Sequence, residues 1–135
     1  MIVTHRGEKY EVIISHELLP EIKAVRTEVF INEQGFENEF DDIDKTAVHC
    51  LLTKNGAPAA VGRLYDENGI AHIGRIAVVK TMRGKGLGSV VLAVLEKYAA
   101  EHGYTRTALS AQCRVQTFYE TNGYHAEGEI YFDEY

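Results

Sequence analysis

Residues 80–89 read KTMRGKGLGS, and this stretch decides the fold of the chain. A strand-like apolar run, Ile73 to Val79, precedes it, and a helical pattern follows it. Its glycines let the backbone bend tightly and let a ligand approach without meeting a Cβ atom. The first N–H groups of the following helix have no partner within the helix, and together with the helix dipole they attract anions. The stretch therefore predicts a phosphate-binding loop between a strand and a helix.

The segment after this loop has the apolar spacing of an amphipathic helix. Its apolar residues recur with helical periodicity and are Leu87, Val90, Val91, Val94, Leu95 and Tyr98. Gly103 is the expected end of this helix, and Thr107 to Ala111 is the next predicted strand. Because a helix separates this strand from the one before the loop, we expect the two strands to be parallel neighbours in a right-handed crossover.

The segment before the loop predicts an antiparallel meander. Three strand-like runs follow one another closely and are Ala47 to Thr53, Ala59 to Tyr65 and Ile70 to Val79. They are joined at Asn55-Gly56 and at residues 66–69, which read DENG. Since Asn-Gly between apolar runs is typical of a hairpin turn, we expect neighbouring runs to pair antiparallel.

Four further elements are predicted towards the two ends. Tyr10 to Ser15 reads as a strand, and a helix begins near Pro20 and ends at Gly35. Near the C-terminus, Val115 to Thr121 predicts a short helix and Ala126 to Phe132 a last strand. The expected order is β-α-β-β-β-α-β-α-β, an α/β fold with helices on the faces of a mixed sheet. The length suits one domain over residues 1–135.

Composition narrows the class of protein. No run reaches the roughly 18 apolar residues of a membrane span, and the N-terminus lacks the apolar core of a signal peptide. The two cysteines are far apart in the sequence, which favours a reduced, cytoplasmic protein. The six histidines show no metal-ligand spacing, so we expect no metal site.

The charges are unevenly placed along the chain. Residues 33–44 hold six acids and no Lys or Arg, which accounts for the whole net charge of −6. Residues 68–95 contain no acid and hold four bases, Arg75, Lys80, Arg83 and Lys85. This separation indicates two ligands of opposite sign, or else a solvated acidic loop. Because no basic face extends beyond the glycine loop, we expect no nucleic-acid partner.

Three known phosphate-binding motifs have glycine patterns similar to that of the loop. A Walker A loop needs glycine where Val79 stands and Ser or Thr where Gly86 stands, so it is excluded. A dinucleotide fingerprint needs a third glycine where Ser89 stands, and it normally opens a parallel sheet instead of following a meander. The motif R/Q-x-x-G-x-G/A is matched in full by Arg83, Gly86 and Gly88.

This third motif resembles the pyrophosphate loop of the GCN5-related N-acetyltransferase (GNAT) superfamily, which binds acetyl-CoA. The strand at residues 75–79 is similar to that family's cofactor strand. Residues 117–124, TFYETNGY, resemble its FYE-x-x-GF segment, with Tyr124 in place of Phe. The resemblance covers about residues 10–132. The pattern from Arg26 to Gln34, with the acidic segment and His49, also resembles a small bacterial subgroup of uncharacterised acetyltransferases.

The resemblance implies where acetyl-CoA would bind. Its pyrophosphate would contact the loop's backbone N–H groups, and its pantetheine arm would pair with the strand before the loop. The expected cofactor-binding residues are Ile76, Ala77, Val78, Arg83, Gly84, Lys85, Gly86, Leu87, Gly88, Ser89 and Gln112.

The resemblance also implies a reaction, the direct attack of an amine on the thioester. We expect Glu33 to accept the amine's proton, with Asp41, Asp42, Asp44 or a water chain as alternatives. Tyr119 stands where the family usually places its general acid. Arg26 and Phe30 share a helix face with Glu33 and are expected, with Asp41 and Asp44, to bind the acceptor. The acidic segment suggests that this small-molecule or peptide amine is cationic.

Two other functions stay open at this point. The loop could bind acyl-CoA in a non-catalytic module. The Arg, Phe and acidic pattern with Gly62-Arg63-Leu64 also distantly resembles acyl-homoserine-lactone synthases, but those are longer and usually carry a Trp here, and this chain has none. The sequence ends where the family's sheet usually turns into a final strand. We therefore expect either further chain or a partner at this edge, as in a homodimer.

Overall fold

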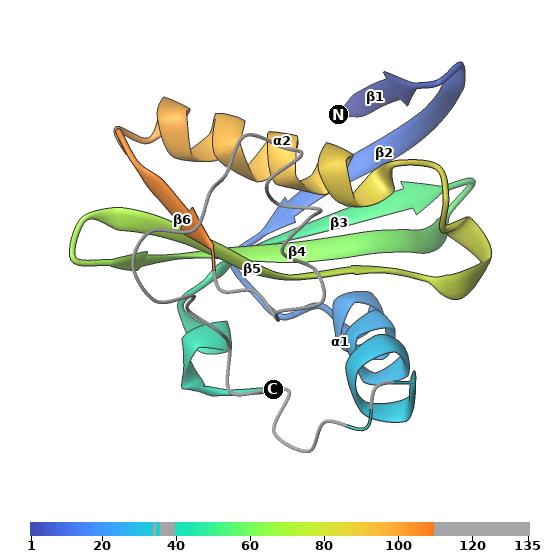
Figure 1. Cartoon of the computed structure of the whole chain (residues 1–135), viewed down its shortest axis with the longest axis horizontal. Coiled ribbons are helices and arrows are strands. Elements are labelled where there is room, and N and C mark those ends of the chain that lie inside the picture. The colour runs from blue at the N-terminus through green and yellow to red at the C-terminus, as the bar shows by residue number, and fades with distance from the viewer. Residues whose placement is uncertain (34, 36–39, 110–135) are drawn as a thin grey trace.

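The computed structural model describes residues 1–33, 35 and 40–109 (Figure 1). Eleven elements lie within these ranges. They are β1 (Ile2–His5), β2 (Glu8–Ser15), α1 (Pro20–Arg26), the π-helical η1 (Thr27–Glu33), the 3₁₀ turn η2 (Asp42–Lys45), β3 (Val48–Lys54), β4 (Ala57–Glu67), β5 (Ile70–Val78), the 3₁₀ turn η3 (Lys80–Met82), α2 (Leu87–Glu101) and β6 (Thr107–Leu109). The strands form one sheet in the order β1-β2-β3-β4-β5-β6.

The sheet is antiparallel from β1 to β5, and β6 is parallel to β5. The predicted meander and the parallel crossover through α2 are therefore confirmed. The turn at Asn55-Gly56 has φ angles of 52° and 81°, the left-handed pair that a two-residue hairpin requires. Val115 to Thr121, Ala126 to Phe132 and the last two residues of the predicted strand 107–111 lie outside the described residues.

β1 was not predicted. It pairs with β2 through a turn at Arg6-Gly7, where φ is 51° and 79°. This is the same left-handed geometry as at Asn55-Gly56, but arginine rarely adopts it, so the sequence carried no turn signal. The result is an extra strand at the start of the expected order, and the fold class is unchanged.

The first helix begins at Pro20 as predicted and changes from α to π geometry at Thr27. Its buried face carries the predicted apolar residues Ile22, Val25 and Val29. The chain leaves the helix at Gly35, whose N–H donates to the Ile31 carbonyl at 3.0 Å and whose φ is 78°.

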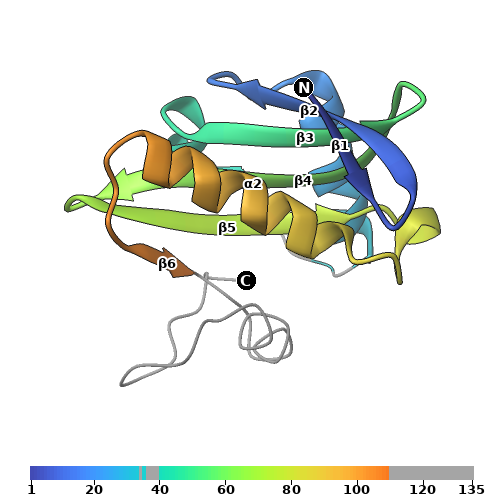
Figure 2. The ribbon, with the colours of Figure 1, turned by 90° about the horizontal axis from the view of Figure 1, so that it is seen from above.

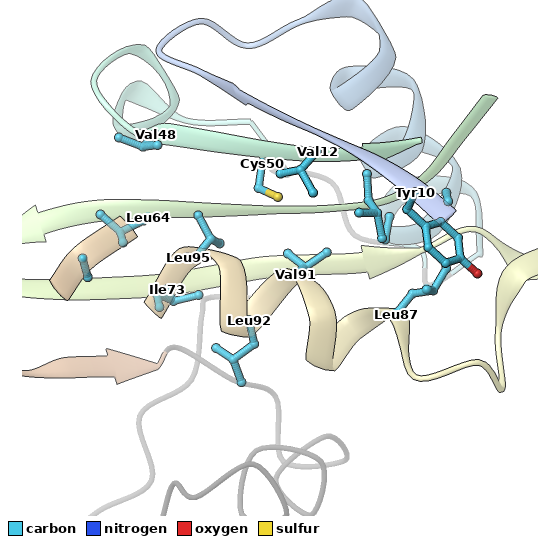
Figure 3. Packing of buried hydrophobic residues seen from close by; sticks show 14 of the residues in the cluster. Tyr10, Val12, Val48, Cys50, Leu64, Ile73, Leu87, Val91, Leu92 and Leu95 are labelled. Atoms are coloured by element: carbon cyan, nitrogen blue, oxygen red, sulfur yellow. The ribbon is translucent and has the colours of Figure 1, made fainter. Parts of the chain in front are cut away.

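The helices cover opposite faces of the sheet, with α2 on one face and α1 on the other (Figure 1). On the α2 face, Leu87, Val91 and Leu95 pack against strand residues such as Cys50 and Leu64 (Figure 3). The α2 helix approaches β4 so closely that a Cβ on Gly62 would lie 2.6 Å from Val91 Cγ1. On the α1 face, a smaller cluster of Ile22, Val25, Val29, Leu51, Val61 and Ala77 is buried.

A β-bulge in β5 changes which residues face each helix. The register with β4 runs Arg63↔Gly74 and then Val61↔Ala77, so β5 has one residue more than β4 at this point. Arg75 lies in the bulge with φ of 51°. Because the extra residue reverses the alternation, Ile73 packs on the α2 side, whereas Ala77 packs on the α1 side.

None of the helices in the described ranges is long and apolar enough to cross a membrane.

Candidate functional site

The glycine loop lies between the end of β5 and the start of α2. Gly84 has φ of 81°, and Gly86, with φ of 77°, is the N-cap residue of α2. Within the described ranges no side chain caps the helix, so the N–H groups of its first turn can donate to a ligand. A Cβ added at Gly84 would meet no atom of the residues that the structure describes within 4 Å. These features fit the pyrophosphate of acetyl-CoA.

Arg83 connects this loop to two other parts of the molecule. Its Nε donates to the Val78 carbonyl at 3.1 Å, at the end of β5. Its Nη1 and Nη2 donate to the two carboxylate oxygens of Glu33, at 2.5 and 2.8 Å, at the end of η1. The hydrogen bond to Glu33 raises the pKa of the Arg83 guanidinium. The predicted base and the predicted phosphate-binding arginine are therefore direct neighbours, although 50 residues separate them.

The β1–β2 hairpin supports the loop from the other side, and its turn lies beside the start of α2 (Figure 2). His5 Nε2 donates to the Lys85 carbonyl at 2.7 Å, and Arg6 Nη1 donates to the Gly84 carbonyl at 3.4 Å. A Cβ on Gly86 would lie 3.0 Å from His5 Nε2 and 3.2 Å from Arg6 Nη2. Sequence reasoning missed this contact because it did not predict β1.

The predicted pantetheine strand, Ile76 to Val78, pairs with β4 through Val61↔Ala77 and Ala60↔Val78. Ala77 is buried, and Ile76 and Val78 are partly buried. On the other edge of β5, β6 pairs with residues 71–73. The described part of β6 thus ends before it reaches Ile76.

Five charged side chains lie close together on the α1 face, and we call them the arginine–aspartate cluster. They are Arg26, Asp41, Asp44, Arg63 and Arg75. Arg26 donates to Asp44 Oδ1 at 2.6 Å and to Oδ2 at 3.1 Å. Arg63 Nη1 donates to Asp44 Oδ1 at 2.9 Å and to Asp41 Oδ1 at 2.8 Å. Arg75 Nη2 lies 3.6 Å from Asp41 Oδ2. The cluster ties η2 to the first helix, β4 and β5.

The centre of this cluster is fully buried. Arg26 is 1% exposed and Asp44 is 3% exposed. Burial opposes ionisation of Asp44, but hydrogen bonds and charge from Arg26 outweigh it and lower the carboxyl pKa to about 2. His49 Nε2 donates to the Asp44 carbonyl at 3.0 Å, and burial lowers the pKa of His49. Guanidinium groups thus bind both carboxylate oxygens of Asp44.

The other predicted acceptor-side residues have different surroundings. Phe30 is half-buried and packs against the smaller core. Asp42 has a side chain that is 96% exposed and lies 3.2 Å from Lys45 Nζ. The structure thus joins Arg26, Asp41 and Asp44 in one cluster and places Glu33 at the glycine loop. Gln112 and Tyr119 lie outside the described residues.

Known proteins share this fold and sequence pattern. Residues 15–134 match the family described as the acetyltransferase (GNAT) domain. An uncharacterized N-acetyltransferase of Bacillus subtilis, YjcF, is 32% identical, and the alignment covers 87% of this chain and 86% of that protein. The crystal structure of an acyl-CoA N-acyltransferase from Pseudomonas aeruginosa is 28% identical, with a TM-score of 0.79 and coverage of 90% and 92%.

An aminoglycoside N-acetyltransferase in complex with CoA shares the fold alone, at 13% identity and a TM-score of 0.70, with coverage of 98% of this chain and 99% of that one. The family match covers most of the chain. The glycine loop before α2 and the mixed sheet point to the same family. The chain belongs to the acetyltransferase (GNAT) domain family and is an acetyl-CoA-dependent N-acetyltransferase.

Proposed function

We propose that this protein transfers the acetyl group of acetyl-CoA to an amine of a small molecule or peptide, by direct attack on the thioester. The proposal rests on the glycine loop, where no side chain of the described residues caps the first turn of α2 and no described atom lies near the Cβ position of Gly84. Hydrogen bonds from the N–H groups of this turn to a charged oxygen are worth about 1.5–3 kcal/mol each. This exceeds the roughly 0.3–1 kcal/mol expected from the helix dipole.

The donor site would consist of the loop and the strand before it. Backbone N–H groups of residues 83–89, with Lys85 nearby, would bind the pyrophosphate. The edge of Ile76 to Val78 that faces away from β4 would pair with the amides of the pantetheine arm. Gln112 is proposed on the family resemblance to contact the same arm.

The acceptor amine must lose a proton before it attacks. A lysine-like amine has a pKa near 10.4, so its neutral form costs about 4.6 kcal/mol at pH 7. Glu33 is the proposed base, because it lies at the loop and its side chain is 37% exposed. Asp44 suits this role poorly, since it is buried and its pKa is about 2. Asp42 is fully solvated and pairs with Lys45.

As the amine nitrogen bonds to the acetyl carbon, the bond between that carbon and the sulfur of CoA breaks. The departing thiolate then needs a proton, for which Tyr119 is the proposed donor on the family resemblance. Arg26 and Asp44 would support the acceptor site by fixing η2, since they bind each other. Because Asp44 is already bound by Arg26, a cationic acceptor would be bound by acidic residues other than Asp44.

The experiment is a measurement of thiol release from acetyl-CoA over a panel of polyamines, amino sugars, amino acids and peptides. We expect release with at least one amine and a loss of about 10²–10⁴-fold in Tyr119→Phe. Tyr124→Phe is the matched control, because the family usually has Phe there, and it should keep activity. CoA binding without thiol release on any amine would contradict the proposal and favour a non-catalytic acyl-CoA module.

A further inference from the structure

Arg83, at the glycine loop, already binds an anion, the carboxylate of Glu33. The Glu33 carboxylate accepts two hydrogen bonds from Arg83, one on each oxygen. A bidentate carboxylate and a phosphate present similar pairs of oxygens to a guanidinium. Glu33 therefore uses the two guanidinium nitrogens, Nη1 and Nη2, with which a phosphate could also pair.

The setting of this ion pair makes it exchangeable. The side chains of Arg83 and Glu33 are 38% and 37% exposed, so water competes for both groups. Ion pairs with this much exposure are weak. A pyrophosphate would instead gain several charge-assisted hydrogen bonds from the N–H groups at the start of α2. Arg83 would keep its hydrogen bond from Nε to the Val78 carbonyl, so it stays oriented while its other partner changes.

The position of Glu33 allows it to leave without rearrangement of the backbone. Glu33 is the last residue of η1, and the chain turns out of the helix at Gly35. A change of side-chain rotamer would move the carboxylate away from Arg83. Leaving is also favoured by repulsion, because a phosphate and a carboxylate at one guanidinium would be two like charges within a few ångströms.

We propose that Glu33 and the pyrophosphate of acetyl-CoA compete for Arg83, so that donor binding breaks the Arg83–Glu33 pair and releases the carboxylate beside the bound donor. The inference rests on the proposed function, which takes the loop as the donor site and Glu33 as the base. A guanidinium favours the charged form of a carboxylate next to it and so opposes its protonation. Arg83 would thus be a positioning residue that restrains the base until the donor arrives.

The test is calorimetric binding of CoA to the wild type and to Glu33→Gln at low ionic strength. Removal of the competing charge should tighten CoA binding about two- to fivefold, the size expected for one exposed ion pair. Acetyl-pantetheine lacks the pyrophosphate, and its binding should not change. Glu28→Gln is the matched control, because Glu28 also lies in η1 and acts on Arg83 through its charge. Its effect should be smaller.

A double-mutant cycle isolates the competition. In an Arg83→Gln background, the E33Q change should leave the affinity for CoA unaltered, because the contested partner is absent. Carbon-13 NMR of labelled glutamate carboxyl groups follows the release itself. The Glu33 signal, assigned by its loss in E33Q, should shift on addition of CoA and stay unchanged on addition of acetyl-pantetheine.

The inference is overturned if E33Q binds CoA no more tightly than the wild type does, or if the Glu33 carboxyl signal does not shift when CoA is added. Either result, in a wild type that binds CoA and releases thiol, leaves the proposed function intact. Failure of the wild type to bind CoA would remove the proposed function and this inference together.

Discussion

Two of the arginine–carboxylate pairs among the described residues have opposite properties. The Arg26–Asp44 pair is buried between the first helix and the sheet, and Arg63 adds a second guanidinium. The Arg83–Glu33 pair is more than one-third exposed and lies at the glycine loop. Burial makes the loss of one partner costly, while exposure makes exchange with a ligand or water easy. The first pair therefore suits a structural role, and the second suits a binding role.

The largest expected effect comes from breaking the buried pair. Asp44→Asn keeps the size of the side chain but removes the buried carboxylate to which Arg26 and Arg63 both donate, so we expect the free energy of unfolding to fall by about 3–5 kcal/mol. Urea denaturation measures this change. Asp42→Asn is the matched control in the same 3₁₀ turn, and its exposed side chain should make it nearly neutral. A loss under 1 kcal/mol in D44N would contradict the structural role.

The second effect is the response of stability to acid. The Asp44 pKa of about 2 lies below the ordinary value of 3.8, so its contribution is present above about pH 4. That contribution is about 2 kcal/mol, and it is lost as the pH falls from about 4 towards 2. Unfolding free energies from pH 6 to pH 3 should therefore fall more steeply in the wild type than in D44N. Parallel curves would show that Asp44 is not held ionised by its arginines.

The smallest effect distinguishes the pairs by salt. At low ionic strength E33Q should lower the free energy of unfolding by about 0.2–1 kcal/mol, as for an exposed pair. In 1 M NaCl the screening length falls to about 3 Å, so the effect of E33Q should vanish. The effect of D44N should persist, because a buried pair is screened much less. A cost of E33Q that is equal at both salt concentrations would place the Arg83–Glu33 pair with the buried one.

Local patterns predicted much of the fold. The helical spacing from Leu87 onwards, the Asn55-Gly56 turn and the glycine loop act through neighbouring residues, and all three have the predicted local geometry. The β1–β2 hairpin was missed because Arg6 in the left-handed region has no sequence signature. The bulge at Arg75 was missed because apolar residues continue on both sides of it.

The candidate site was harder to predict, because its contacts join residues far apart in sequence. The sequence pattern around Arg83 predicts a ligand of the donor, and the pattern around Glu33 predicts a residue of the acceptor site. Only the fold brings the two side chains together across 50 residues. Likewise, the sequence predicts Arg26 and Asp44 as separate ligands of the acceptor, because no pattern in it indicates that they pair. In the structure they bind each other.

The glycine loop is the proposed binding site of the donor. The most direct measurement is a titration of the nitrogen-15-labelled protein with CoA, followed through its amide signals by NMR. We predict that the largest shifts fall on Gly84, Gly86, Gly88 and Ser89, and that acetyl-pantetheine moves these signals much less than CoA does. Saturable CoA binding whose largest shifts lie elsewhere, with the loop signals unmoved, would contradict donor binding at the glycine loop.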